Sequence, residues 1–195
     1  VYPMAIAHAA GVVAAVADAA ESGLTGCTLS SGLHHARRGN GCGYCTINGI
    51  AVACWWVRLN QPDVRVGILD VDAHCGGGTA EMITGMGDVT QVDVSVNSFD
   101  FHPDATMVRR PDTYIPAVEA ALTALLGTHP DIVIVNAGVD PIDHGITAAQ
   151  LTERDHLIAE RLDHCDIPAV VTLAGGYTSR WLDEAGLVDL HRTTI

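Results

Sequence analysis

The stretch VRVGILDVDAHCGGG, residues 64–78, determines both the fold and the chemistry that we expect of this chain. Residues 64–69 form a short apolar run rich in β-branched side chains, which predicts a buried strand. Asp70, Asp72 and His74 follow this run directly, and the glycines at 76–78 predict a tight turn into a short helix. Polar groups at the carboxyl end of a buried strand are typical of a ligand site at the edge of an α/β sheet.

Strand and helix alternate in both directions from this stretch. Short continuous apolar strands that alternate with helices are typical of a parallel sheet covered on both faces. We therefore expect a three-layer α/β fold in a single domain, 1–195. Strands are expected at 27–30, 64–69, 89–96, 132–135 and 169–173. Helices are expected at 3–22, from a cap at Asn48 to about residue 60, and at 112–127, 148–164 and 179–190.

Composition limits the classes of protein that the chain can belong to. It has 195 residues, a formal net charge of -13 and 48% hydrophobic residues, which excludes a disordered or acidic-tail protein. Such acidity argues against nucleic acid or an anionic membrane as the main partner, and it favours a positively charged or neutral ligand.

The cysteines and the apolar start predict the compartment. Six cysteines are too sparse for a disulfide scaffold in a domain of this size, so we expect reduced thiols and a cytoplasmic protein. The apolar stretch 3–20 contains His8 and Asp18 and has no basic residue before it, which argues against a signal peptide or membrane span. The lack of lysine beside abundant alanine, glycine and arginine suggests a bacterial source with GC-rich DNA.

Polar residues follow the other predicted strands as well. In a parallel sheet these strand ends meet at one edge, so we expect the side chains to lie together. The residues concerned are His34 and His35 after the first strand, Ser95 and Val96 after the third, Asp140 after the fourth, and Gly175, Gly176 and Tyr177 after the fifth.

These residue types suit metal-assisted hydrolysis of an amide or ester. Asp72, His74 and Asp140 would give three protein ligands with a fourth position open, which is the pattern of catalytic zinc. A histidine pair can supply a general base and acid near neutral pH, and Tyr177 can donate its hydroxyl to an oxyanion. Each element alone has an ordinary structural explanation, such as a helix cap or a packed aromatic, but the ordered set is much more specific.

The motifs resemble those of the zinc-dependent histone deacetylase family. Ser31-Gly32-Leu33-His34-His35-Ala36, with Gly43-Tyr44-Cys45 and Asn48, is similar to its twin-histidine segment. Leu69 to His74 is similar to its metal segment, and Gly138-Val139-Asp140 and Gly175-Gly176-Tyr177 to its third-ligand and tyrosine segments. The similarity runs in order from about residue 10 to 190 and implies the arginase–deacetylase type of α/β fold.

The resemblance also implies residue roles. One zinc ion would bind Asp72, His74 and Asp140, His34 would pair with Asp70, His35 would be the general base, and Tyr177 would polarise the acyl carbonyl. Potassium is implied as an additional ion. Its site would comprise Asp70, Asp72, His74, Ser95 and Val96, and the substrate channel would comprise Gly43, Tyr44, Phe101, His102, Gly175 and Gly176.

Some positions depart from the family pattern. Gly77 stands where the family usually has the Asp or Asn that holds the second histidine, which predicts that His35 has no orienting partner. The residues that usually precede the first helix are absent, so we expect a fold truncated at its N-terminal side, with a more open pocket and an exposed sheet edge. A homo-oligomer or a missing partner segment would cover that edge.

We therefore expect a metal-dependent amidohydrolase that removes an acetyl or similar acyl group from a small acylated amine, such as an acetylpolyamine, or from acetyl-lysine. One alternative is an arginase-like hydrolase with two manganese ions, although position 76 is Gly where a second carboxylate would be needed. Another is a degenerate, non-enzymatic binding module on the same fold. Cys42-x-x-Cys45 could be a redox or zinc pair, and a buried structural thiol at Cys45 is the alternative.

Overall fold

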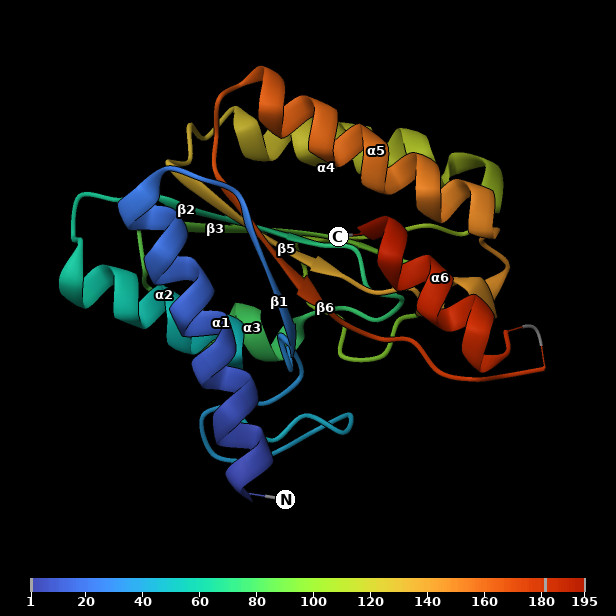
Figure 1. Ribbon diagram of the computed structural model, residues 1–195, viewed down its shortest axis with the longest axis horizontal. Coiled ribbons are helices and arrows are strands. Elements are labelled where there is room, and N and C mark those ends of the chain that lie inside the picture. The colour runs from blue at the N-terminus through green and yellow to red at the C-terminus, as the bar shows by residue number, and fades with distance from the viewer. Residues whose placement is uncertain (1, 181, 195) are drawn as a thin grey trace.

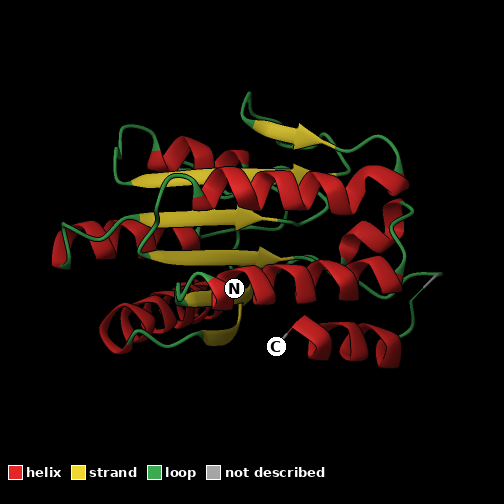
Figure 2. Cartoon of the chain, turned by 90° about the horizontal axis from the view of Figure 1, so that it is seen from above, coloured by secondary structure: helices red, strands yellow, loops and turns green. Residues whose placement is uncertain are grey.

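The protein forms a six-stranded, entirely parallel sheet between two layers of helices (Figure 1). The computed structural model describes residues 2–180 and 182–194. The strand order is β1-β6-β5-β2-β3-β4, and Figure 2 shows the strands pointing the same way. The strands are β1 (Gly26–Ser31), β2 (Val66–Asp70), β3 (Val89–Ser95), β4 (Ala105–Met107), β5 (Ile132–Ala137) and β6 (Ala169–Leu173). The helices are α1 (Tyr2–Ser22), α2 (Gly49–Asn60), α3 (Gly77–Ile83), α4 (Tyr114–Leu126), α5 (Ala148–His164) and α6 (Glu184–Thr194), with 3-10 turns η1 (Pro111–Thr113) and η2 (Asp140–His144).

The three-layer architecture predicted from the sequence is confirmed, and three details differ. The short edge strand β4 was not predicted, because three residues without an apolar run give no strand pattern. The expected helix at 112–127 begins with the 3-10 turn η1. The last helix begins at Glu184 rather than 179, and Trp181, within the expected span, lies outside the described residues.

Each face of the sheet has its own apolar core. Helices α1, α2 and α3 pack on one face and α4, α5 and α6 on the other, as Figure 1 shows. Fully buried aliphatic side chains of β2 and β5 alternate between the two cores, so the central strands are apolar on both sides. This burial fixes the positions of the central strand ends.

Helix α1 is long and apolar enough to cross a membrane by length and composition, a test that core helices of globular proteins also pass. Its small side chains lie against α2 and β1 at helical spacing. The buried residues of this stripe are Ala5, Ala9, Val12, Val16 and Ala19.

The register of the central strands gathers polar groups at one edge. Asp70, the last residue of β2, lies opposite Asn136 of β5 and Asp93 of β3. Parallel strands all present their carboxyl ends to this edge, so the loops that leave them converge there. The sheet therefore delivers the polar residues that the sequence places after each strand to one region.

A fully buried arginine ties the loops after β2 and β5 together. Nη1 of Arg154, on α5, donates to the carbonyl oxygens of Val71 at 3.2 Å and Gly138 at 2.6 Å. Its Nε donates to Asp155 at 2.7 Å, and Tyr114 Oη lies 3.3 Å from Nη1. The two carbonyls belong to residues just before Asp72 and just before Val139-Asp140, so this cation fixes the backbone beneath the expected metal ligands.

Arg154→Leu should lower the free energy of unfolding by about 3–5 kcal/mol, because it leaves buried carbonyls and a carboxylate without their donor. Arg161→Leu is the matched control on the same helix, since Arg161 is partly exposed and its Glu119 partner lies 3.7 Å away. The control should lose less than about 1 kcal/mol. Urea unfolding of both variants measures the difference, and equal losses would contradict the assigned role of Arg154.

Candidate functional site

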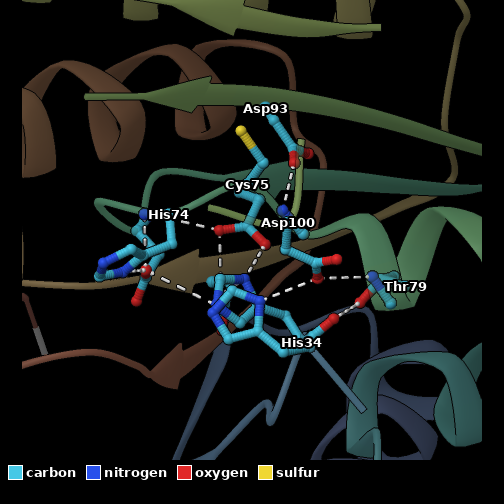
Figure 3. A network of polar contacts seen from close by, with 12 residues as sticks. His34, His74, Cys75, Thr79, Asp93 and Asp100 are labelled. Atoms are coloured by element: carbon cyan, nitrogen blue, oxygen red, sulfur yellow. Dashed lines mark hydrogen bonds and ion pairs between the residues drawn. The ribbon is translucent and has the colours of Figure 1, made fainter. Parts of the chain in front are cut away.

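Three side chains at the carboxyl edge form a candidate metal centre. Asp72 and His74 follow β2, and Asp140 begins η2 just after β5. His74 Nδ1 lies 3.2 Å from Asp72 Oδ1 and 3.2 Å from Asp140 Oδ2, and one donor atom from each residue lies within 4.8 Å of the others. Figure 3 shows His74 at this end of the polar network. Two carboxylates and one imidazole within this distance fit the donor set of catalytic zinc.

The backbone leaves space where these donors point. Asp72 Oδ2 accepts the Gly175 N–H at 2.8 Å, and Asp140 Oδ1 accepts the Ala73 N–H at 3.0 Å. A Cβ atom at Gly175 would lie 2.2 Å from Asp140 Oδ2 and 2.6 Å from Asp72 Oδ2. A side chain at Gly175 would therefore fill the space beside the ligand atoms, and glycine keeps it open.

Burial and close packing of like charges perturb this donor set. Burial and the neighbouring Asp72 charge raise the pKa of Asp140. Burial also opposes ionisation of Asp72, but His34 and hydrogen bonds from His74 and Gly175 lower its pKa overall. Hydrogen bonds to Asp140 and Asp72 raise the pKa of His74 to about 9. Without metal the His74 proton thus offsets part of the negative charge.

His34 is paired with Asp70 behind the metal ligands, as the resemblance implied. His34 Nδ1 lies 2.7 Å from Asp70 Oδ2, and Asn136 Nδ2 donates to Asp70 Oδ1 at 3.0 Å. Burial alone would lower the pKa of His34, but the charges of Asp70 and Asp72 raise it well above its usual value. His34 is therefore held as a cation beside the centre.

His35 has an orienting partner, so the prediction that it lacks one because of Gly77 is wrong. His35 Nδ1 lies 2.9 Å from Oδ2 of Asp100, and both side chains are buried. Asp100 lies in the loop after β3, and Figure 3 shows it in the same polar network as His34. The sequence prediction failed because a partner from a distant loop leaves no mark on the motif around residue 77.

Burial and the nearby His34 cation lower the pKa of His35 to about 4, although Asp100 works in the opposite direction. The rings of His34 and His35 lie 3.9 Å apart between centroids. Protonating both of two adjacent buried imidazoles costs free energy, because the two positive charges repel each other. The pair therefore contains one cation, His34, and one neutral ring, His35, near neutral pH.

A small cavity of about 70 Å³ joins the metal ligands, the histidine pair and Tyr177. Burial and the charges of Asp140 and Asp72 raise the pKa of Tyr177, which keeps its hydroxyl protonated. Gly43 and Tyr44 form the tip of a two-residue hairpin between Cys42 and Cys45 at the rim, and Tyr44 is 95% exposed. A larger hollow of about 480 Å³ lies against β5, β6 and α5, shares no lining residue with this cavity and is lined mostly by apolar side chains.

Not every expected site residue lines the cavity. Gly43, Tyr44 and Gly175 do, whereas Phe101 is exposed elsewhere and His102 points inward, with Nε2 2.8 Å from Asp93 Oδ2. Two residues of this loop contact His35, namely Asp100 through its carboxylate and Phe99, whose ring lies edge-on to His35 at 4.9 Å. This loop has no periodicity, so the sequence does not indicate which of its residues point toward the histidines.

Two of the residues expected to hold potassium, Asp72 and His74, belong to the candidate metal centre itself. Asp70, Ser95 and Asp72 are buried, and Ser95 Oγ has no hydrogen-bond partner among the described residues. A buried hydroxyl without a hydrogen-bond partner is compatible with an oxygen ligand of a cation.

Five residues that support the site were not predicted. Asn136 is the last residue but one of the apolar strand β5, and Arg37 lies in a loop and pairs with Glu81 and Asp100. For all of these residues except one aromatic, the only signal is a polar side chain where the surrounding sequence is apolar or loop-like. The unpredicted residues are Arg37, Phe99, Asp100, Asn136 and Arg154.

The fold and the site together define an α/β protein with a candidate mononuclear metal centre at the carboxyl edge of a parallel sheet. The family model of the histone deacetylase domain matches residues 1–110, which is more than half of the chain. The chain belongs to the histone deacetylase domain family.

Named relatives agree with this assignment. Histone deacetylase 2 of Arabidopsis thaliana is 27% identical over 170 residues, covering 76% of this chain and 43% of the relative. Acetoin utilization protein AcuC of Staphylococcus aureus is 42% identical over 77 residues, covering 37% and 20%. The crystal structure of acetylpolyamine aminohydrolase from Burkholderia pseudomallei shares the fold with a TM-score of 0.77 and 22% identity, covering 96% of this chain and 60% of that one. The chain thus spans about 60% or less of the length of these proteins.

Metal affinity should rise with pH. The His74 proton, held by a pKa of about 9, must leave before Nδ1 can bind a metal. Zinc binding at pH 7 should release about one proton, and affinity should rise about tenfold per pH unit up to about pH 9. Calorimetric titration in buffers of different ionisation enthalpy measures the released proton, and a pH-independent affinity would contradict the assignment of His74.

Asp140→Ala should abolish tight zinc binding, because it removes one of three protein ligands. Asp143→Ala, an exposed aspartate in the same 3-10 turn, is the matched control and should bind zinc like the parent. Metal content after dialysis distinguishes them. Retention of stoichiometric zinc by Asp140→Ala would show that the ion binds elsewhere.

Proposed function

We propose that this chain is a metal-dependent amidohydrolase that removes an acetyl or similar small acyl group from an acylated amine. The observation that supports it most directly is one cavity that joins a three-ligand donor set, a neutral buried imidazole and a tyrosine hydroxyl. Membership of the histone deacetylase domain family supports the same reaction class.

Each residue has a role that follows from its environment. Bound zinc would supply a Lewis acid for the acyl oxygen and lower the pKa of a water molecule. His35, neutral because of burial and His34, accepts the proton of the attacking water and returns it to the departing amine. His34 stays protonated against Asp70 and stabilises negative charge, and the Tyr177 hydroxyl donates to the developing oxyanion.

The cavity and the charge of the chain favour a small acyl group on a cationic amine. A volume of about 70 Å³ suits an acetyl group, and the exposed Tyr44 ring stands at the rim where the rest of the substrate would lie. A net charge of -13 favours a cationic chain such as a polyamine or the peptide around an acetyl-lysine. The structurally similar acetylpolyamine aminohydrolase bears a name that fits this class.

The rival arginase-like reaction needs a second metal ion. Among the described residues, the structure brings together one group of donors, Asp72, His74 and Asp140. Position 76 is glycine, and a Cβ atom added there would lie 2.6 Å from Asp70 Oδ2. A carboxylate side chain at position 76 would therefore collide with the carboxylate of Asp70. One metal ion per chain by elemental analysis would support the mononuclear reaction, and two would support the rival.

Turnover of a fluorogenic acetyl-lysine amide and of a monoacetylated diamine, each with and without a chelator, tests the proposal. A chain that binds zinc and hydrolyses neither substrate would support the non-enzymatic binding module instead. The ratio of kcat/KM for the two substrates separates acetyl-lysine from polyamine specificity.

Tyr177→Phe should lower kcat by about 10²–10³ with zinc content unchanged, because it deletes one oxyanion donor and keeps the ring. Tyr2→Phe, an exposed residue of α1, is the control and should have the activity of the parent. Steady-state kinetics and metal analysis on the same preparations make the comparison. Unchanged kcat in Tyr177→Phe would remove tyrosine from the mechanism.

A further inference from the structure

The imidazole of His35 is fixed by a carboxylate that the twin-histidine motif does not contain. Asp100 Oδ2 accepts from His35 Nδ1 at 2.9 Å and from the Gly78 N–H at 3.0 Å. Asp100 Oδ1 accepts from Nη2 of Arg37. Because two other donors converge on this carboxylate, it acts as the acceptor and His35 Nδ1 as the donor. The lone pair of His35 then lies on Nε2, the nitrogen left free to act in the cavity.

The same carboxylate explains the glycine at position 77. A Cβ atom there would lie 2.3 Å from the backbone oxygen of Asp100 and 2.7 Å from Asp100 Oδ1. No side chain at 77 can coexist with Asp100 in its present place. Glycine at position 77 therefore leaves room for Asp100, and its lack of a side chain does not leave His35 without a partner.

The conformation of the loop after β3 directs the Asp100 side chain toward His35. Asp100 has a φ of +57°, a left-handed conformation that aspartate tolerates better than most residues. The Phe99 carbonyl accepts the Cys75 N–H at 3.1 Å, and Asn97 Oδ1 accepts the Phe99 N–H at 2.9 Å. The loop after β3 is thus hydrogen-bonded to the turn after β2 next to Asp100. Arg37 joins this loop to α3, because it binds Asp100, Glu81 and the Gly77 carbonyl oxygen.

We propose that Asp100, secured by Arg37, is the positioning residue of His35, and that Gly77 is required to leave room for it. This inference rests on the proposed function of His35 as proton acceptor. The same loop also places the Phe99 ring edge-on against His35, so one segment contacts the imidazole through both a carboxylate and an aromatic ring.

Asp100→Asn tests the positioning role. It keeps size and replaces the acceptor by an amide that can present a donor to Nδ1, so kcat should fall about 10–100-fold with KM and zinc content unchanged. Asp104→Asn, an exposed residue of the same loop with the same change in charge, is the control and should keep the parent kcat. Equal kcat in Asp100→Asn and the parent would overturn the proposal.

A second readout does not depend on turnover. With isotope-labelled histidine, the Nδ1–H proton of His35 should give a downfield NMR signal, assigned by its loss in His35→Gln. The signal should disappear in Asp100→Asn and persist in Asp104→Asn. A signal that survives in Asp100→Asn would overturn the proposal even if kcat fell. If the parent hydrolyses no acylated amine but the signal behaves as expected, the positioning role stands and the proposed function fails.

Gly77→Ala tests the steric half of the proposal. The added methyl group must displace Asp100, so the NMR signal should weaken and kcat should fall as in Asp100→Asn. Gly87→Ala is the control, because an added Cβ there meets nothing within 4 Å. Gly77→Asp should likewise lower activity, since it adds a second carboxylate where no space exists. A faster Gly77→Asp enzyme would show instead that position 77 is a vacant partner site for His35.

Discussion

Three aspartate carboxylates are buried together at the ends of β2 and β5, and their mutual repulsion is the constraint on which the site depends. Asp70, Asp72 and Asp140 are at most 3% exposed, so water does little to screen them. Buried charge of one sign is costly unless cations and hydrogen-bond donors surround it. His34 and His74 supply positive charge, and backbone N–H groups of Ala73 and Gly175 complete the set. A divalent cation bound by Asp72, His74 and Asp140 would take the place of the His74 proton in this balance.

The close packing of these carboxylates against the backbone requires glycine at neighbouring positions. The carboxylates pass so near the backbone that a Cβ at Gly138 would lie 2.7 Å from Asp72 Oδ2 and 2.8 Å from Asp140 Oδ1. A Cβ at Gly78 would lie 2.5 Å from the His35 carbonyl oxygen. Glycine at these positions thus reflects close approach between loops rather than a need for unusual backbone angles. Arg154 then fixes the same loops from behind through their carbonyl groups.

The sequence predicts the site residues that lie at strand ends, but it does not predict the contacts that come from the loops. Asp70, Asp72, His74 and Asp140 follow apolar strands, and parallel strands must bring their carboxyl ends to one edge, so their convergence follows from local pattern. Asp100 lies 65 residues from His35, in a loop without periodicity, and its contact depends on how that loop packs on α3. Arg154 lies within a charged amphipathic pattern that favours solvent exposure, yet tertiary packing buries it completely. Local rules locate elements and strand ends, whereas contacts between loops are set by packing that no window of sequence contains.

The division between sheet and loops also divides the chemistry. The strands hold the metal ligands and the His34–Asp70 pair in a register fixed by two apolar cores, so these groups cannot move independently. The loop after β3 and the hairpin at Gly43-Tyr44 both pack against His35. A Cβ atom added at Gly43 would lie 2.4 Å from His35 Cδ2 and 2.9 Å from the Phe99 ring. Changes in these two loops would therefore alter the base and the cavity wall together while leaving the charge cluster intact. A side-chain carboxylate carried on such a loop, in place of one at position 77, ties the orientation of His35 to the conformation of the loop after β3.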